Sequence, residues 1–540
     1  MSARRARAGT PPAAPGWTST RALRLWAPAL VLLAPVALLC MAGRFDGLYG
    51  QDPYAYYNYA IGPLRDSLLS LRPLPAFFWP PGYPLLVALA SLVLGETPLA
   101  GQVVSLLMGA AAVVGAALLA EEVWVRRQGL ATPQPWLVPL AAALLVACHP
   151  QLWQSSAVVM ADTTGLAAAT LGAWALARYG RARRGRWLAL AAAGLAFAIL
   201  SRWIYGMAAA AGAAYALTLL RSARAGSSPR RSVWHALAAV AVAGLVLAPI
   251  WGPAVLRSAV AAPEAAPFAG SFGVYTWSPL NALRREFATT DGVLSYRLPN
   301  GLYYALAPAH RYYFTPLLAG LLLPGLWTAL RGGRRALWWL LAWAGLVFAF
   351  HAGAPWQNFR FTLAYLPPLA VLAAVGLETV LGWLTARGLR QWRWLAWGVF
   401  GLGLVYMLAG AVALTQGFVT RKQADLRTVA AVEALLPPEA LLLTFNQTFT
   451  FQHYSTLETL ELYDLAASEL PALLGDERLT FVLVDVGNIE SQWVNEPLGA
   501  TYRWLRDERG LETVAQFGDL TLFRVVETSE VFKTSEVYPT

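Results

Sequence analysis

Six ionisable side chains stand at the ends of apolar segments, where a charge costs free energy unless water or a partner stabilises it. They are Asp52, His149, Asp162, Arg202, His351 and Arg360. Carboxylates and histidines accept protons, and arginines hold anions through paired hydrogen bonds. If these side chains meet on one membrane face, we expect them to bind an anionic substrate and to remove a proton from a neutral one.

The elements that must position these residues are membrane helices. The chain of 540 residues is 57% hydrophobic and 13% charged, with a mean hydropathy of +0.48. This composition predicts a polytopic α-helical membrane protein, because a spanning helix needs about 20 apolar residues. We predict eleven spans, near residues 25–42, 99–120, 136–149, 163–179, 187–201, 203–220, 235–252, 312–330, 336–352, 362–383 and 394–415.

Arginine placement predicts the orientation. Residues 1–24 and alternate loops carry most of the arginines, whereas most carboxylates of the helical part fall on the other loops. The positive-inside rule therefore predicts a cytoplasmic N-terminus in the cell (inner or plasma) membrane, with the six ionisable residues on the outer side. Because the arginine clusters set orientation, the net charge of +11 does not indicate nucleic acid. Cys40 and Cys148 lie in apolar runs without metal-ligand spacing.

Three regions outside the spans complete the predicted organisation. Within the transmembrane part, residues 25–415, two long outer loops cover residues 43–98 and 253–311, and the first contains a short apolar helix lying in the interface. Residues 421–527 have a soluble pattern of buried strands, a hairpin and amphipathic helices, which predicts a small extracytoplasmic α/β domain. Residues 528–540 form a tail.

The ordered motifs resemble a known family. An apolar helix is followed by a long outer loop with an early Asp and then by PPGYPLL, HPQLWQSSAVVMADTTGL, LSRW and NFRFTLAYLPPLAVLAAVGL. Over residues 20–385 this order resembles the GT-C glycosyltransferases, such as the protein O-mannosyltransferases and the lipid A aminoarabinose transferase. The resemblance implies an enzyme that transfers a sugar from a polyprenyl phosphate carrier to an acceptor on the outer face.

The resemblance also implies roles for single residues. Asp52 and Asp162 take the catalytic positions, and Arg202 and Arg360, with His351, lie near the carrier phosphate. Tyr54, Tyr57 and His149 are candidates for acceptor or sugar binding. Because a carrier phosphate is a good leaving group, transfer needs one base and no general acid, unlike glycoside hydrolysis. Asp52 serves as that base, and a single displacement predicts inversion at the anomeric carbon.

Two departures from the family affect these roles. O-mannosyltransferases have Asp-Glu where this chain has Asp52-Pro53, so the acceptor geometry does not carry over directly. Oligosaccharyltransferases gather several acids around a metal, whereas Asp162 stands alone, so the sequence predicts no metal ligands and leaves a divalent cation as the one open cofactor.

Each candidate also has a structural interpretation. Asp52-Pro53 is typical of a turn, and Asp162 is suited to cap the helix that follows it. Arg202 and Arg360 can extend from helix ends to lipid headgroups. The histidines fit structural roles, and the tyrosines fit an interfacial aromatic belt.

Two other functions fit the same pattern. A transporter or flippase of lipid-linked sugars is the main alternative, although the sequence lacks the paired repeats and interrupted helices that transporters often show. A binding protein with a membrane anchor is the third, for which eleven helices are excessive. The sugar, the carrier and the class of acceptor, whether protein, lipid or glycan, cannot be read from the sequence.

Overall fold

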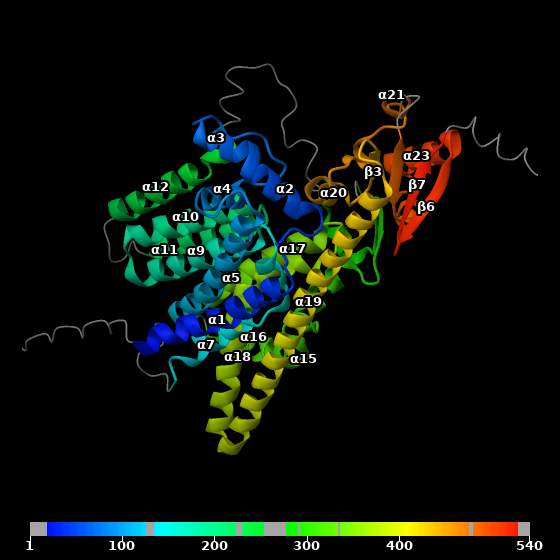
Figure 1. Cartoon of the computed structure of the whole chain (residues 1–540). Helices are drawn as coiled ribbons and strands as arrows, with labels where there is room; N and C mark the ends of the chain where they lie inside the picture. Colours follow the sequence, from blue (N-terminus) through cyan, green and yellow to red (C-terminus); the bar gives the residue numbers. More distant parts are fainter. Residues whose placement is uncertain are drawn as a thin grey trace, which may run out of the picture.

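The computed structural model describes residues 19–125, 134–222, 229–252, 277–289, 292–332, 335–474 and 479–526. It consists of a helical bundle and a small sheet domain (Figure 1). The first half of the bundle contains α1 (Ser19–Ala42), α2 (Gln51–Tyr59), α3 (Arg65–Leu69), α4 (Gly82–Leu94), α5 (Pro98–Ala120), α7 (Leu137–Ala147), α8 (Pro150–Ala157), α9 (Asp162–Ala182), α10 (Gly185–Ser201), α11 (Tyr205–Ser222) and α12 (Pro229–Val246).

The second half of the bundle begins after a two-stranded antiparallel hairpin, β1 (Glu286–Thr289) and β2 (Gly292–Ser295). Its helices are α14 (Asn300–Leu306), α15 (Thr315–Ala319), α16 (Leu322–Arg331), α17 (Arg335–Gly353), the 3₁₀ segment η8 (Phe359–Tyr365), α18 (Leu366–Ala386) and α19 (Arg393–Leu435). Each of the eleven predicted runs is helical for most of its length, and the predicted interfacial segment is α4.

The chain is a multi-pass membrane protein. Among the described residues, five helices are long and apolar enough to cross a membrane, and a sixth span results if α7 and α8, bent by 57°, count as one. Helices such as α9 do not reach that hydropathy because their ends carry arginines, Arg178 and Arg181 among them. The number of eleven spans therefore stays a prediction.

Glycines permit a close approach of two helices, α16 and α18. A side chain at Gly376 of α18 would overlap the carbonyl oxygen of Leu321, and one at Gly325 of α16 would overlap that of Leu372. The two backbones thus approach each other without side chains between them, as is typical of small residues between membrane helices. This contact fixes α18, which continues directly from η8.

The C-terminal domain is built on a five-stranded sheet with the order β4-β3-β5-β7-β6. The strands are β3 (Leu441–Thr444), β4 (Glu458–Glu461), β5 (Thr480–Val484), β6 (Leu511–Phe517) and β7 (Leu520–Val525). β3 pairs in parallel with β4 and β5, and β7 pairs antiparallel with β5 and β6. The helices are α20 (Thr448–Tyr454), α21 (Leu470–Leu474), α22 (Val486–Ser491) and α23 (Pro497–Trp504). The small α/β domain is confirmed.

Helix α19 joins the bundle to this domain. It contains 43 residues, about 65 Å at 1.5 Å per residue, and runs along the bundle up to the sheet (Figure 1). The sequence pattern predicted a span that ends near residue 415 and a separate amphipathic helix from residue 421, but the structure has one continuous helix. Its last turns pack Val429 and Val432 against Leu442 and Leu483 of the sheet.

Candidate active site

The start of α2 positions the first acid. Gly50 has φ 76°, a conformation that favours glycine, and helix α2 begins at the next residue. Asp52 lies in the first turn, where the helix dipole favours a negative charge. Pro53 fits in this turn because the backbone nitrogens of a first turn have no hydrogen-bond partner within the helix, so the missing N–H of proline costs nothing there. The Asp52 side chain is 41% exposed, so it is accessible to a substrate.

The start of α9 positions the second acid. Asp162 is also a first-turn residue, but its side chain is only 6% exposed. Its Oδ2 accepts a hydrogen bond from Arg202 Nη1 at 3.0 Å, and Arg202 follows the last residue of α10. A buried carboxylate needs a partner, and Arg202 provides one to Asp162.

Arg360 connects the two acids. It lies on η8, whose start is fixed by a hydrogen bond from the Arg360 backbone N–H to the side chain of Asn358 at 3.0 Å. Its Nη2 donates to Asp52 Oδ2 at 3.3 Å, and its Nε lies 3.8 Å from Asp162 Oδ2. The four side chains thus form a chain of alternating charge, Asp52–Arg360–Asp162–Arg202, from an exposed end to a buried end.

A cavity opens at the exposed end of this chain. It measures about 410 Å³ and is lined by residues from α2, α8, η8 and α19, including Asp52 and Arg360. Further polar side chains in its wall include Gln151, Gln154 and Asn358. Such a polar cavity next to one accessible carboxylate and one arginine suits a substrate with hydroxyl groups and an anionic group.

Tyr56, on the buried side of α2, is close enough to interact with all four charged residues. Burial raises the pKa of Tyr56, and the nearby arginines lower it while the nearby acids raise it. The phenol therefore stays neutral near pH 7. Asp52 is the carboxylate exposed at the cavity, so it is the candidate proton acceptor.

His351 lies beside the buried end. Its ring stacks between Tyr304 at 5.3 Å and Phe361 at 5.2 Å, and it is close enough to Arg202 for their charges to interact. In the part of the chain that the structure describes, its Nε2 is buried and has no hydrogen-bond partner.

The other three predicted residues lie elsewhere. Tyr54 is buried against α20 of the C-terminal domain. Tyr57 donates a hydrogen bond to the backbone oxygen of Glu96 at 2.9 Å. His149 is fully buried, with its ring 4.4 Å from that of Tyr313. None of these three residues lines the cavity beside Asp52.

The sequence reasoning missed the polar cavity wall and Tyr56. Gln151 and Gln154 follow His149 by two and five residues, inside a motif already singled out, so their spacing of three on α8 was an available signal. No three histidine, cysteine or acidic side chains in the described ranges gather closely enough to hold a metal ion. Asp52 and Asp162 are instead paired with arginines.

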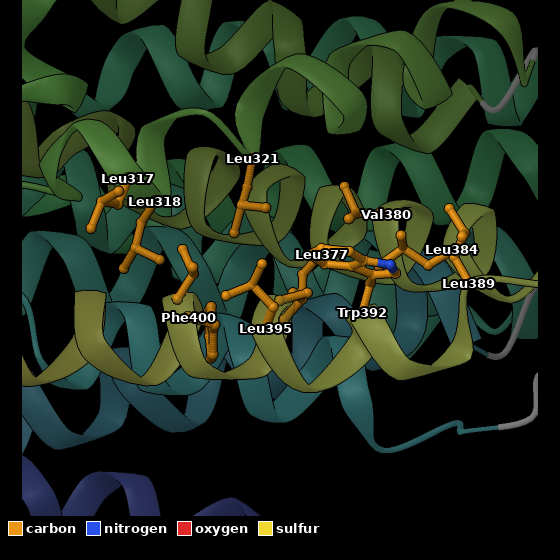
Figure 2. A pocket seen from close by; sticks show the side chains of 12 residues that line it. Leu317, Leu318, Leu321, Leu377, Val380, Leu384, Leu389, Trp392, Leu395 and Phe400 are labelled. Carbon is orange, nitrogen blue, oxygen red and sulfur yellow. The ribbon is translucent and has the colours of Figure 1, made fainter.

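A second cavity is unrelated to this chemistry. It measures about 350 Å³ and its lining is apolar, with Leu377 and Leu384 of α18 facing Leu395 and Phe400 of α19 (Figure 2). The cavity is also far from Arg360 along the chain. Leu384 lies 18 residues beyond Leu366, the first residue of α18 after η8, and this corresponds to about 27 Å along the helix. No charged side chain lines it.

The bundle, the long loop after α1, which carries Asp52, and the C-terminal α/β domain form a fold of the GT-C type, as comparison with solved structures shows. No family model and no curated protein matches the chain. Among solved structures, ArnT from Cupriavidus metallidurans bound to undecaprenyl phosphate is similar, with a TM-score of 0.58, 15% identity, and coverage of 92% of this chain and 98% of that one. The archaeal oligosaccharyltransferase AglB from Archaeoglobus fulgidus, in complex with an inhibitory peptide and a dolichol-phosphate, has a TM-score of 0.53, 13% identity, and coverage of 93% and 74%. The predicted GT-C resemblance is therefore confirmed at the level of the fold.

Proposed function

We propose that this protein is an inverting glycosyltransferase that moves a sugar from a polyprenyl phosphate carrier to an acceptor on the outer face of the cell membrane. Its fold is shared with structures that hold undecaprenyl phosphate and dolichol-phosphate. The arginine placement along the sequence supports the outer location.

One observation carries the proposal. An exposed carboxylate, Asp52, and a guanidinium, Arg360, meet at 3.3 Å on the wall of a polar cavity. Arg360 is held in turn by the buried Asp162, which also orients Arg202. The arrangement therefore offers a proton acceptor to a hydroxyl group and two fixed positive charges to an anion, which is what transfer from a sugar phosphate requires.

The chemical step is a single displacement. The acceptor hydroxyl attacks the anomeric carbon while Asp52 takes its proton, the bond from that carbon to the carrier phosphate oxygen breaks, and the phosphate leaves with the electron pair. Arg360 and Arg202 stabilise the charge that develops on the departing phosphate. Asp162 acts by holding both arginines, and His351 contributes its free Nε2. Tyr54, Tyr57 and His149 receive no sugar contact in this mechanism.

The test uses the purified protein in liposomes that contain radiolabelled polyprenyl phosphate sugars and candidate acceptors. We expect transfer by the wild type and its loss in Asp52→Asn. The matched control is Asp66→Asn, because Asp66 is an exposed acid at the start of α3 in the same outer loop. Movement of the intact lipid across the bilayer without transfer would support the flippase alternative and contradict the proposal.

A further inference from the structure

A buried lysine connects the C-terminal domain to the helix that carries Asp52. Lys422 lies on α19 and is only 3% exposed. Its Nζ donates a hydrogen bond to the hydroxyl of Tyr54 at 2.7 Å. It also lies 3.9 Å from the ring centroid of Tyr454 on α20 and 3.9 Å from Oδ1 of Asp46 in the first outer loop. Three separate segments of the chain therefore meet at one ammonium group.

The acceptors around Lys422 are themselves held in place. The hydroxyl of Tyr454 donates a hydrogen bond to Asp46 Oδ2, and Asp46 Oδ1 accepts one from the backbone N–H of Leu48 at 3.1 Å. The ring of Tyr454 lies 6.4 Å from that of Tyr54, edge to face. The ammonium group of Lys422 thus contacts a hydroxyl, a carboxylate and an aromatic face. These contacts compensate for the water that a buried cation loses. We call Asp46, Tyr54, Lys422 and Tyr454 the lysine cluster.

The lysine cluster lies on the opposite side of α2 from the candidate site. Tyr54 follows Asp52 by two residues, and two residues correspond to about 200° around a helix. Asp52 therefore faces Arg360 and the cavity while Tyr54 faces Lys422. Because α2 has only nine residues, fixing one side of it also fixes the rotation of the other side. Figure 1 shows α2 next to α20, at the end of α19 that meets the sheet domain.

The domain also holds the first residue of α2. The Gln51 side-chain nitrogen donates a hydrogen bond to the backbone oxygen of Asn446, in the loop after β3. Gln423 of α19 also donates a hydrogen bond from its side-chain nitrogen to the backbone oxygen of Gly43 at 3.1 Å. The contacts to the first outer loop thus extend on both sides of Asp52 in the sequence.

We propose that Lys422 is a positioning residue for transfer, and that the C-terminal domain acts through the lysine cluster to set the orientation of Asp52 toward the substrate. This inference rests on the proposed function, since it concerns the same carboxylate. It assigns the C-terminal domain a role in the catalytic geometry. An ion pair that is largely buried adds little net stability on its own. Losing one partner is costly, however, so such a pair suits a contact that selects one arrangement of the domain against the loop.

The test compares Lys422→Met with Arg427→Met, a control on the same helix whose side chain is exposed. A misplacement of about 1 Å at a reacting group costs on the order of 100-fold in rate. We expect kcat to fall about 10- to 100-fold in Lys422→Met while KM for the donor changes less than about threefold. Arg427→Met retains the wild-type values. Tyr454→Phe, which keeps the ring and removes one hydrogen bond, gives an intermediate kcat.

Hydrogen–deuterium exchange supplies a readout that does not depend on knowing the substrate. We expect faster exchange in residues 51–59 of Lys422→Met than in wild type or Arg427→Met, and unchanged exchange in α5. Wild-type kcat and unchanged exchange in both Lys422→Met and Tyr454→Phe would overturn the inference. Absence of transfer by the wild type itself would contradict the proposed function, while faster exchange in α2 would still support the positioning role. If Lys422→Met does not fold, the kcat and the exchange of residues 51–59 in Tyr454→Phe test the inference: wild-type values of both would overturn it.

Discussion

The two acids of the site differ in burial, and this difference predicts that the same substitution lowers stability by unequal amounts. Asp162 is 6% exposed and its hydrogen-bond partner Arg202 is 20% exposed, whereas Asp52 is 41% exposed. We expect Asp162→Asn to lower the free energy of unfolding by about 3 kcal/mol, because removing one partner of a buried ion pair leaves the other charge without compensation. We expect Asp52→Asn to lower it by less than about 1 kcal/mol, because water already screens that pair.

The measurement is reversible unfolding in mixed detergent micelles, with both variants and wild type under the same conditions. A double variant, Asp162→Leu with Arg202→Leu, provides the control for the physical cause, since replacing both charges by apolar groups should recover part of the loss. Similar small losses for Asp52→Asn and Asp162→Asn would refute the reasoning from burial. A double variant less stable than Asp162→Asn would refute the argument that the unpaired guanidinium causes the loss.

Three more predictions follow from the same geometry. Gly376→Ala should destabilise the protein by about 3 kcal/mol because the new methyl group overlaps the carbonyl of Leu321, whereas Gly382→Ala on the same helix has no atom within 4 Å and should be neutral or slightly stabilising in the same unfolding measurement. Arg360→Lys should lower kcat at least about 10-fold in the liposome assay, because a single ammonium group cannot span the two carboxylates that Arg360 joins; a rate equal to wild type would contradict this. Transfer should continue in excess chelator, because in the proposed mechanism Arg202 and Arg360 supply the positive charge at the phosphate. A loss of transfer that added Mg²⁺ or Mn²⁺ restores would contradict this prediction.

Much of the fold could be predicted from the sequence because a bilayer imposes a simple rule. A spanning helix must satisfy its own backbone, so an apolar run of sufficient length becomes a helix almost regardless of its neighbours. The strands at 441–444 and 480–484 were equally evident, because parallel strands buried on both faces form continuous apolar runs. The predicted break in α19 was wrong because hydropathy falls near residue 416 while nothing stops the helix before Pro437.

The site was predicted in part. Asp52, Asp162, Arg202 and Arg360 were chosen because charge at a helix end is costly, and the structure brings these four together. Their pairing could not be predicted, since Asp52 and Arg360 are 308 residues apart and the contact depends on how the helices pack.

The burial of Lys422 and Tyr54 could not be predicted from the sequence. A lysine just beyond an apolar run, as at Lys422, suggests solvent exposure, and a tyrosine in an outer loop suggests an aromatic belt. Both are buried because the C-terminal domain folds back on the loop that follows α1. No local pattern in the sequence contains that information.

The central claim is a single displacement at a sugar carried on a polyprenyl phosphate. The most direct measurement is the anomeric configuration of the transferred sugar, determined by NMR on the product of the purified protein and compared with that of the donor. The account predicts a product with inverted configuration, formed by the wild type and reduced on the order of 100-fold or more in Asp52→Asn. A product with retained configuration, or equal product from both proteins, would contradict it.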